Sequence, residues 1–226
     1  QGLPLSLNLI GLQSSSGFAI NGVSVGDELG NSVSGAGDIN GDGIADLIVG
    51  APKADPNGDE SGAAYVVFGS NQGLPHPLAL ADLDGSNGFA MAGVSAGDRL
   101  GWSVSNAGDI NQDGVDDIMI GAALADPNGE DSGAAYVLFG SNQAWPATVD
   151  LSGLNGANGF RINGVGAGDR SGASVSTAGD FNADGQDDLV VGAPWADPGG
   201  DKSGASYLIL NASSPQTGVI FADGFE

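Results

Sequence analysis

Three short acidic segments hold the side chains whose types and spacing could bind a metal ion. They read DINGDGIAD at residues 38–46, DINQDGVDD at 109–117 and DFNADGQDD at 180–188. Each places an oxygen-bearing side chain at its first, third, fifth and ninth positions. Oxygens on alternate residues can point inward when the backbone curls around one point, and the carbonyl of the seventh residue would complete the cage. A glycine at the sixth position suits the tight turn, because it carries no Cβ.

The predicted ligands follow directly from this spacing, with the seventh residue of each segment contributing its backbone carbonyl. In chain order they are Asp38, Asn40, Asp42, Ile44, Asp46, Asp109, Asn111, Asp113, Val115, Asp117, Asp180, Asn182, Asp184, Gln186 and Asp188.

The donor chemistry of these segments favours calcium. The donors are hard oxygens, mostly carboxylates, without His or Cys, and this set selects Ca²⁺ over zinc or copper. Mg²⁺ ranks second, because it prefers fewer protein ligands in a stricter octahedron. Each segment also crowds three carboxylates into a small volume, and a cation would relieve their repulsion. We therefore expect three structural Ca²⁺ sites, one per segment.

Two other interpretations of the acidic segments can be weighed on the sequence. An EF-hand needs a Glu at the twelfth position and a helix on each side, but the twelfth residues are Val49, Ile120 and Val191 and both flanks resemble strands. A metal-free Asx turn is the second alternative, since Asp, Asn and Gly favour turns by themselves. Three copies that keep all four oxygen positions while the residues between them vary favour the metal.

Composition narrows the classes of function. The 226 residues carry a formal net charge of −23 with five Lys and Arg, which argues against nucleic acid and anionic membranes as partners. The chain has no Cys, which excludes disulfides and thiolate-bound zinc. The sequence contains no run of about 18 apolar residues, so no transmembrane helix is predicted. The first residue is Gln1 rather than Met, so we expect a processed, exported protein.

The acidic segments belong to a repeat with a period of 71 residues. The heptapeptides that begin at Gly17, Gly88 and Gly159 (GFAINGV, GFAMAGV and GFRINGV) keep the same step as the acidic segments. We divide residues 5–211 into three units, at about 5–75, 76–146 and 147–211, followed by a tail at 212–226. A step that never slips indicates recent duplication, or units that make identical contacts with their neighbours.

Each unit is expected to form four strands and no helix. In the first unit these are GFAINGV (17–23), NSVSGAGD (31–38), DLIVGAP (46–52) and GAAYVVFGS (62–70), with the acidic segment between the second and third strands. About 70 residues with four strands is the size of one propeller blade. The predicted fold is therefore all-β, a propeller-like array of three four-stranded blades.

The 71-residue unit resembles the FG-GAP repeat, the blade unit of integrin α-subunit propellers. The residues that carry the resemblance are GDELGNSVSGAGDINGDGIADLIVGAP at 26–52 and YVVFGS at 65–70, and it extends over nearly all of 5–211. It implies a β-propeller with Ca²⁺ in the blade hairpins and an extracellular adhesive or scaffolding role. Departures are Leu29-Gly30, Leu100-Gly101 and Ser171-Gly172 in place of Phe-Gly, and Gly-Ala-Ala at Gly121.

Three blades are few for a ring, for which four is the usual minimum. If each blade takes its outer strand from the next repeat, residues 1–24 would complete a blade built from the third repeat. That closure can occur within one chain or between chains, and an offset contact would propagate a filament. The tail at 212–226 contains TGVIF and is expected to dock as an added strand, in the same chain or in a neighbour.

The remaining candidates favour plainer explanations. Repeated Asp27- and Asp55-type residues are expected in turns, although a second metal site stays open. His76 is a lone linker residue, and the unrepeated Trp102, Trp145 and Trp195 could stack on a sugar or pack against protein.

No catalytic motif is present, so we expect no enzyme. The leading hypothesis is a secreted, Ca²⁺-stabilised structural or adhesive protein that assembles into an oligomer or filament and contacts extracellular protein or glycan. The alternative is a carbohydrate-binding module, or an accessory domain of a secreted hydrolase.

Overall fold

The computed structural model describes residues 9, 17–73 and 78–210. Apart from two single 3₁₀ turns, η1 (Leu80–Asp82) and η2 (Leu151–Gly153), its regular elements are strands. The expected all-β architecture is therefore confirmed. The predicted tail strand at 212–226 and His76 lie outside the described residues.

The first blade combines strands from successive repeats. β2 (Ser32–Gly37), β3 (Asp46–Ala51) and β4 (Ala63–Val67) form an antiparallel meander. β6 (Gly88–Ala92), which comes from the second repeat, then pairs antiparallel with β4. β10 (Thr148–Asp150) adds a parallel fifth strand against β6. The blade therefore takes its outer strand from the next repeat, as the sequence led us to consider.

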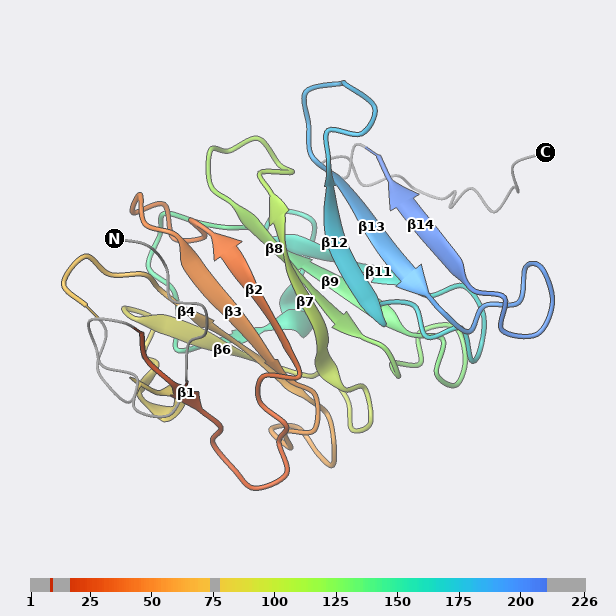
Figure 1. Ribbon diagram of the computed structural model, residues 1–226, viewed down its shortest axis with the longest axis horizontal. Helices are drawn as coiled ribbons and strands as arrows, with labels where there is room; N and C mark the ends of the chain where they lie inside the picture. Colours follow the sequence, from red (N-terminus) through yellow and green to blue (C-terminus); the bar gives the residue numbers. More distant parts are fainter. Residues whose placement is uncertain (1–8, 10–16, 74–77, 211–226) are drawn as a thin grey trace.

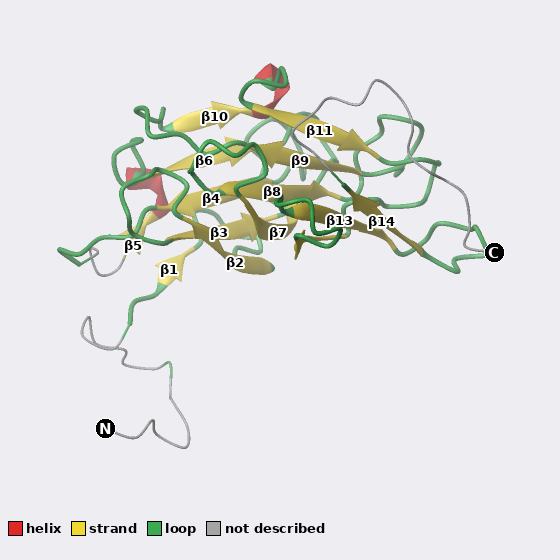
Figure 2. Ribbon diagram, turned by 90° about the horizontal axis from the view of Figure 1, so that it is seen from above, coloured by secondary structure: helices red, strands yellow, loops and turns green. Residues whose placement is uncertain are grey.

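The second blade repeats this construction. β7 (Leu100–Gly108), β8 (Asp117–Ala122) and β9 (Ala134–Leu138) form the meander, and β11 (Gly159–Asn163) from the third repeat pairs antiparallel with β9. The sheets lie side by side (Figure 2). β10 and β11 form one edge of their sheets, which we call the outer edge, and β2 and β7 form the opposite, inner edge.

The third blade has three strands among the described residues. β12 (Ser174–Gly179), β13 (Asp188–Ala193) and β14 (Ala205–Ile209) pair antiparallel, and within the described part of the chain no strand covers the outer edge of β14. β1 (Ile20–Asn21) pairs in parallel with β5 (Leu78–Ala79) at the opposite end of the array (Figure 1). The described residues thus form an open array, in which β1 does not close onto β14 of its own chain.

Apolar side chains from facing sheets fill the space between neighbouring blades. The core between the first two blades includes Ile48, Val66, Phe89 and Ile118, each with no exposed surface. A second core cluster, which contains Met119 and residues of β13, joins the second and third blades. Burying a side chain of this size contributes about 1.5–3 kcal/mol. The cores therefore fix how each blade sits against the next.

Glycines let the backbones of neighbouring blades touch. A Cβ built on Gly50 of β3 would lie 2.0 Å from the carbonyl oxygen of Gly101 in β7. The same relation recurs one repeat later, where a Cβ on Gly121 would lie 2.0 Å from the carbonyl oxygen of Gly172. The Gly of the repeated Gly-Ala motif is therefore required by the close approach of two sheets.

Candidate metal loops

Each acidic segment forms the loop of the hairpin between the two inner strands of a blade. In the first blade the loop leaves β2 at Asp38 and enters β3 at Asp46. The Asp38 carboxylate accepts from the backbone N–H of Asp42 through Oδ1 (3.0 Å) and from that of Gly43 through Oδ2 (2.8 Å). The backbone therefore curls around the first carboxylate, as the spacing predicts.

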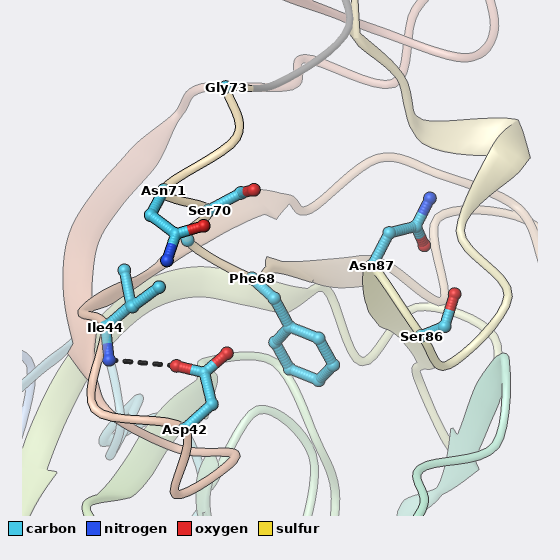
Figure 3. Close-up of a pocket in the computed structure, with 9 residues that line it drawn as sticks. Asp42, Ile44, Phe68, Ser70, Asn71, Gly73, Ser86 and Asn87 are labelled. Carbon is cyan, nitrogen blue, oxygen red and sulfur yellow. Dashed lines mark hydrogen bonds between the residues drawn. The ribbon is translucent and has the colours of Figure 1, made fainter.

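The third and fifth residues extend the same curl. Asn40 Oδ1 accepts from the Asp42 N–H (2.9 Å), and Asn40 Nδ2 donates to Asp42 Oδ2 (3.1 Å). Asp42 Oδ1 accepts from the Ile44 N–H (2.8 Å), the bond drawn in Figure 3. Three of the predicted side-chain ligands thus lie around one turn of backbone.

The second and third loops have the same geometry as the first. Asp109 and Asp180 accept from the backbone N–H groups of the fifth and sixth loop residues at 2.9–3.0 Å. Asn111 and Asn182 likewise hold Asp113 and Asp184. The threefold repetition of the sequence is therefore a threefold repetition of structure.

The ninth residue anchors the loop to the sheet. Asp46 is buried, and its carboxylate accepts from the N–H of Ile39 (3.0 Å) and from the N–H of Gly69 beyond β4 (2.7 Å). Asp117 makes the same two bonds, to Ile110 (3.0 Å) and Gly140 (2.8 Å). These residues join the start of the loop to the end of the third strand of the meander.

The third anchor shows one of the two bonds. Asp188 accepts from the Phe181 N–H (2.9 Å). The residue that corresponds to Gly69 and Gly140 is Asn211, which lies outside the described residues.

Burial, and to a lesser extent neighbouring charges, disfavour the ionised form of the buried Asp in the first two loops. Burial, reinforced by the charges of Asp38 and Asp42, raises the pKa of Asp46 to about 6. Burial likewise raises the pKa of Asp117 to about 7, with Asp113 and Asp109 acting in the same direction. Backbone N–H donors oppose both shifts without cancelling them. A cation in the loop would relieve this repulsion.

The donor set fits Ca²⁺, although the side chains bond mainly to loop amides in this structure. Within the described ranges, no three His, Cys, Asp or Glu side chains gather closely enough to form a metal cluster. Each loop nevertheless supplies three carboxylates and one amide oxygen, and a carboxylate oxygen that accepts one N–H keeps a lone pair. The fifteen predicted ligands therefore remain a prediction that rests on donor chemistry and the curled backbone.

The structure adds one loop position, the eighth, which the sequence pattern did not single out. Asp116, the eighth residue of the second loop, accepts from the backbone N–H of Asp38 in the neighbouring blade (2.7 Å). Asp187 lies in the same place against Gly108, whose added Cβ would be 1.9 Å from Asp187 Oδ2. The first repeat has Ala45 at this position. The change from Ala45 to Asp116 and Asp187 between repeats is the sequence signal that could have identified the contact.

The other repeated acids form turns in the structure. Asp55 Oδ1 accepts from the Glu60 N–H (2.7 Å), and Asp126 Oδ1 accepts from the Asp131 N–H (2.7 Å). Residues of the Asp27 type each accept from a backbone N–H three positions earlier. These contacts are the turn geometry that the sequence favoured.

The tryptophans contact protein groups. Trp145 stacks on Phe89, with ring centroids 4.4 Å apart and planes 13° apart, and packs against the core between the first two blades. The Arg170 guanidinium carbon lies 3.4 Å from the ring centroid of Trp195, and Lys202 Nζ lies 4.4 Å from it. Packing against protein, the plainer expectation, accounts for both side chains.

An open hollow lies beside the first loop. Asp42 and Ile44 line one side, Ser86 and Asn87 line the other, and Phe68 lies between them (Figure 3). The hollow joins the loop to the segment that precedes β6.

These features define a class of protein: a propeller-type repeat array whose blades borrow their outer strand and carry an acidic loop in the inner hairpin. The FG-GAP repeat family matches residues 29–67, 100–138 and 171–209, more than half of the chain. The chain therefore belongs to the FG-GAP repeat family.

Curated relatives extend this result. The chain is 32% identical over 179 residues to phosphatidylinositol-glycan-specific phospholipase D of Bos taurus. The match covers 78% of this chain and 20% of that protein. It is 31% identical over 182 residues to integrin alpha-4 of Xenopus laevis, which covers 80% of this chain and 16% of that protein. The chain thus spans a fifth or less of the length of these relatives. In the described part of the chain, no helix has the length and apolarity that crossing a bilayer requires.

Proposed function

We propose that this chain is an extracellular, non-enzymatic FG-GAP module, stabilised by Ca²⁺, with a structural or adhesive role. The observation that carries the proposal is the identical acidic loop in all three blades, built around oxygen donors of one chemical kind. Each loop joins two inner strands, so an ion held there would stabilise the blade as a whole.

A structural role for the ions agrees with the magnitudes involved. A site with a Kd near 10⁻⁴ M in millimolar Ca²⁺ contributes roughly 1.4 kcal/mol, so three sites contribute about 4 kcal/mol. That is a large part of the 5–15 kcal/mol of a typical folded domain. Millimolar Ca²⁺ is found outside cells, which is why we place the protein there.

A non-catalytic role rests on the symmetry of the acidic groups. The carboxylates of interest occur once per repeat, whereas a catalytic pair would need residues that break the repeat. The proposed partners are further copies of this chain and extracellular protein or glycan.

Chelation tests the calcium proposal. Removing Ca²⁺ with a chelator should lower the Tm by roughly 10 °C, from about 4 kcal/mol and a shift of about 2–4 °C per kcal/mol for a chain of this size. Magnesium at the same concentration should restore less than half of the loss, because it suits this donor set less well. An unchanged Tm in chelator would refute the structural role of calcium.

Self-association is the second part of the proposal. The described residues leave one edge of β14 uncovered, and an exposed strand edge is a template for pairing with another chain. Sedimentation velocity in millimolar Ca²⁺ over a hundredfold range of concentration tests this part. A strict monomer at all concentrations would contradict it.

A further inference from the structure

We call the contact between one repeat and the next a junction. Each of the two junctions in the chain contains an ion pair at the same repeat position. Arg99 of the second repeat pairs with Glu60 of the first. One repeat later, Arg170 Nη2 lies 3.2 Å from Asp131 Oδ2. In both junctions the cation comes from the later repeat and the anion from the earlier one.

A backbone ladder accompanies each ion pair. The N–H groups of Gly97, Arg99 and Leu100 donate to the carbonyls of Asp59, Glu60 and Ser61, at 2.9, 3.1 and 3.0 Å. The corresponding bonds between the second and third repeats are 2.8, 3.1 and 3.1 Å long. The junction is thus a fixed arrangement that the chain builds twice.

At the two ends of the array, the ion-pair positions carry charges opposite to those in the internal junctions. Glu28 stands where the later repeats have Arg99 and Arg170, and Lys202 stands where the earlier repeats have Glu60 and Asp131. The backbone is the same at the exchanged positions, with φ of 55° at Glu28 and 51° at Lys202, against 48–57° at the four junction residues. A third junction would therefore again be a cation facing an anion, with the polarity reversed.

The backbone groups of that third junction are free among the described residues. The N–H groups of Glu28 and Leu29 and the carbonyls of Lys202 and Ser203 have no hydrogen-bond partner there. Their counterparts are bonded to one another in both internal junctions. The two ends of the array are therefore complementary in hydrogen bonding as well as in charge.

The strands at the two ends also correspond. β1 lies on β5 with Ile20 opposite Leu78, and one repeat later β6 lies on β10 with Met91 opposite Val149. The remaining edge of β6 pairs with β4, so the same edge of β1 is positioned to receive a strand. β14 has an uncovered edge, and its Leu208 is 40% exposed, whereas the corresponding Val66 is fully buried.

We propose that β1 of one copy completes the third blade of a second copy, pairing with β14 and setting Glu28 against Lys202. This inference rests on the self-association proposed above and names its interface. β1 lies on β5 at the opposite end of the array from β14 (Figure 1), so pairing β1 with β14 would join two different copies. The register follows that of β6 on β4 and places Asn21 opposite Ala205.

The new junction is weaker than the internal ones. Asn57 and Asn128 donate to the carbonyls of Gly93 and Gly164 across the internal junctions, and Gly199 replaces them in the third repeat. Ala45 likewise lacks the carboxylate with which Asp116 reaches the neighbouring blade. The ion pair itself is partly exposed in the internal junctions, with 24–34% of each side chain accessible, and pairs of that kind guide specificity more than they add affinity. The assembly is therefore reversible.

Charge exchange tests this interface. Glu28→Lys and Lys202→Glu each place like charges together and should weaken the self-association constant roughly fivefold to tenfold. The double variant E28K/K202E should regain wild-type association, because it has the polarity of the internal junctions. An equimolar mixture of the two single variants should also associate, since each supplies the charge that the other lacks. That rescue requires contact between different chains.

Controls separate the interface from stability and from self-association in general. Lys53→Leu removes the partner of Glu28 within its own blade (2.7 Å) and copies Leu124 of the second repeat, so it should leave association unchanged. All variants are measured in millimolar Ca²⁺ with the Tm checked. Association that persists equally in both single variants overturns this interface and leaves self-association standing, whereas a monomeric wild type overturns both and leaves the calcium proposal intact.

Hydrogen exchange identifies the strand on β14. Amides of 17–21 and 205–209 should become protected together as concentration rises. Protection of 205–209 that is independent of concentration would instead show that the chain covers its own edge, and would overturn the proposal.

Discussion

Asp116 accepts a hydrogen bond from the backbone N–H of Asp38 (2.7 Å), so a carboxylate of the second acidic loop closes onto the loop of the preceding blade. Asp38 is itself a predicted metal ligand. The contact therefore couples two loops that the sequence presents as independent sites, and it makes the loops part of the packing between blades.

Asp116→Ala should lower the free energy of unfolding by about 1.5–3 kcal/mol, the usual contribution of a hydrogen bond to a charged group. Ala45→Asp is the matched control, because it restores the repeat consensus where the described residues contain no preceding blade. It should change stability by less than about 0.5 kcal/mol. Denaturant unfolding in millimolar Ca²⁺ measures both variants at a protein concentration at which the chain is monomeric, because Ala45 would face another copy in the proposed assembly. Equal effects would contradict the coupling.

Asp117→Asn should be among the most damaging changes in the acidic loops. The carboxylate is fully buried and accepts from two backbone N–H groups, and an amide can accept only one of them. We expect a loss of about 2–3 kcal/mol and, by calorimetric titration, one Ca²⁺ fewer per chain. Asp59→Asn, an exposed acid outside the loops, should retain stability and ion count. An unchanged ion count in Asp117→Asn would remove Asp117 from the predicted ligands.

Gly50→Ala tests the close approach of the first two blades. Its Cβ would lie 2.0 Å from the Gly101 carbonyl oxygen, a contact that only a shift of backbone can relieve. Overpacking of this kind costs about 1–3 kcal/mol, occasionally more. Gly35→Ala is the control, because a Cβ at that strand position meets nothing within 4 Å. Thermal unfolding should separate the two variants, and similar Tm values would refute a role for Gly50 in packing.

Much of the architecture could be predicted because it follows local rules. Alternating Asp and Asn with Gly specify the curled loop, and β-branched runs between turn residues specify the strands. The pairing of β6 with β4 could be stated only as one possibility, because the sequence does not specify which repeats are neighbours in space. Parallel pairing of β1 with β5 had no local signal, because two residues of strand carry no pattern that distinguishes parallel from antiparallel neighbours.

Side-chain roles between blades were the least predictable. Asp116 and Asp187 occupy none of the predicted ligand positions, and the residues they contact lie in the preceding repeat. Trp145 breaks the repeat, and the sequence left sugar stacking open beside the favoured packing against protein; the structure stacks it on Phe89, against the core. In both cases the deciding contact is long-range, which composition and spacing do not encode.

Trp145 gives the final prediction. Its ring stacks on Phe89 and its Nε1 donates to the Ser141 carbonyl (3.1 Å), so Trp145→Ala should lose about 3–5 kcal/mol as expected for a large aromatic packed against the core. Trp195→Leu copies Leu124 of the second repeat at a position that is 38% exposed, and it should change stability by less than about 1 kcal/mol. Equilibrium unfolding compares the two. A Trp145→Ala protein that stays fully stable but loses binding on a glycan array would reverse our assignment, because Trp145 would then be a binding residue and not a core residue.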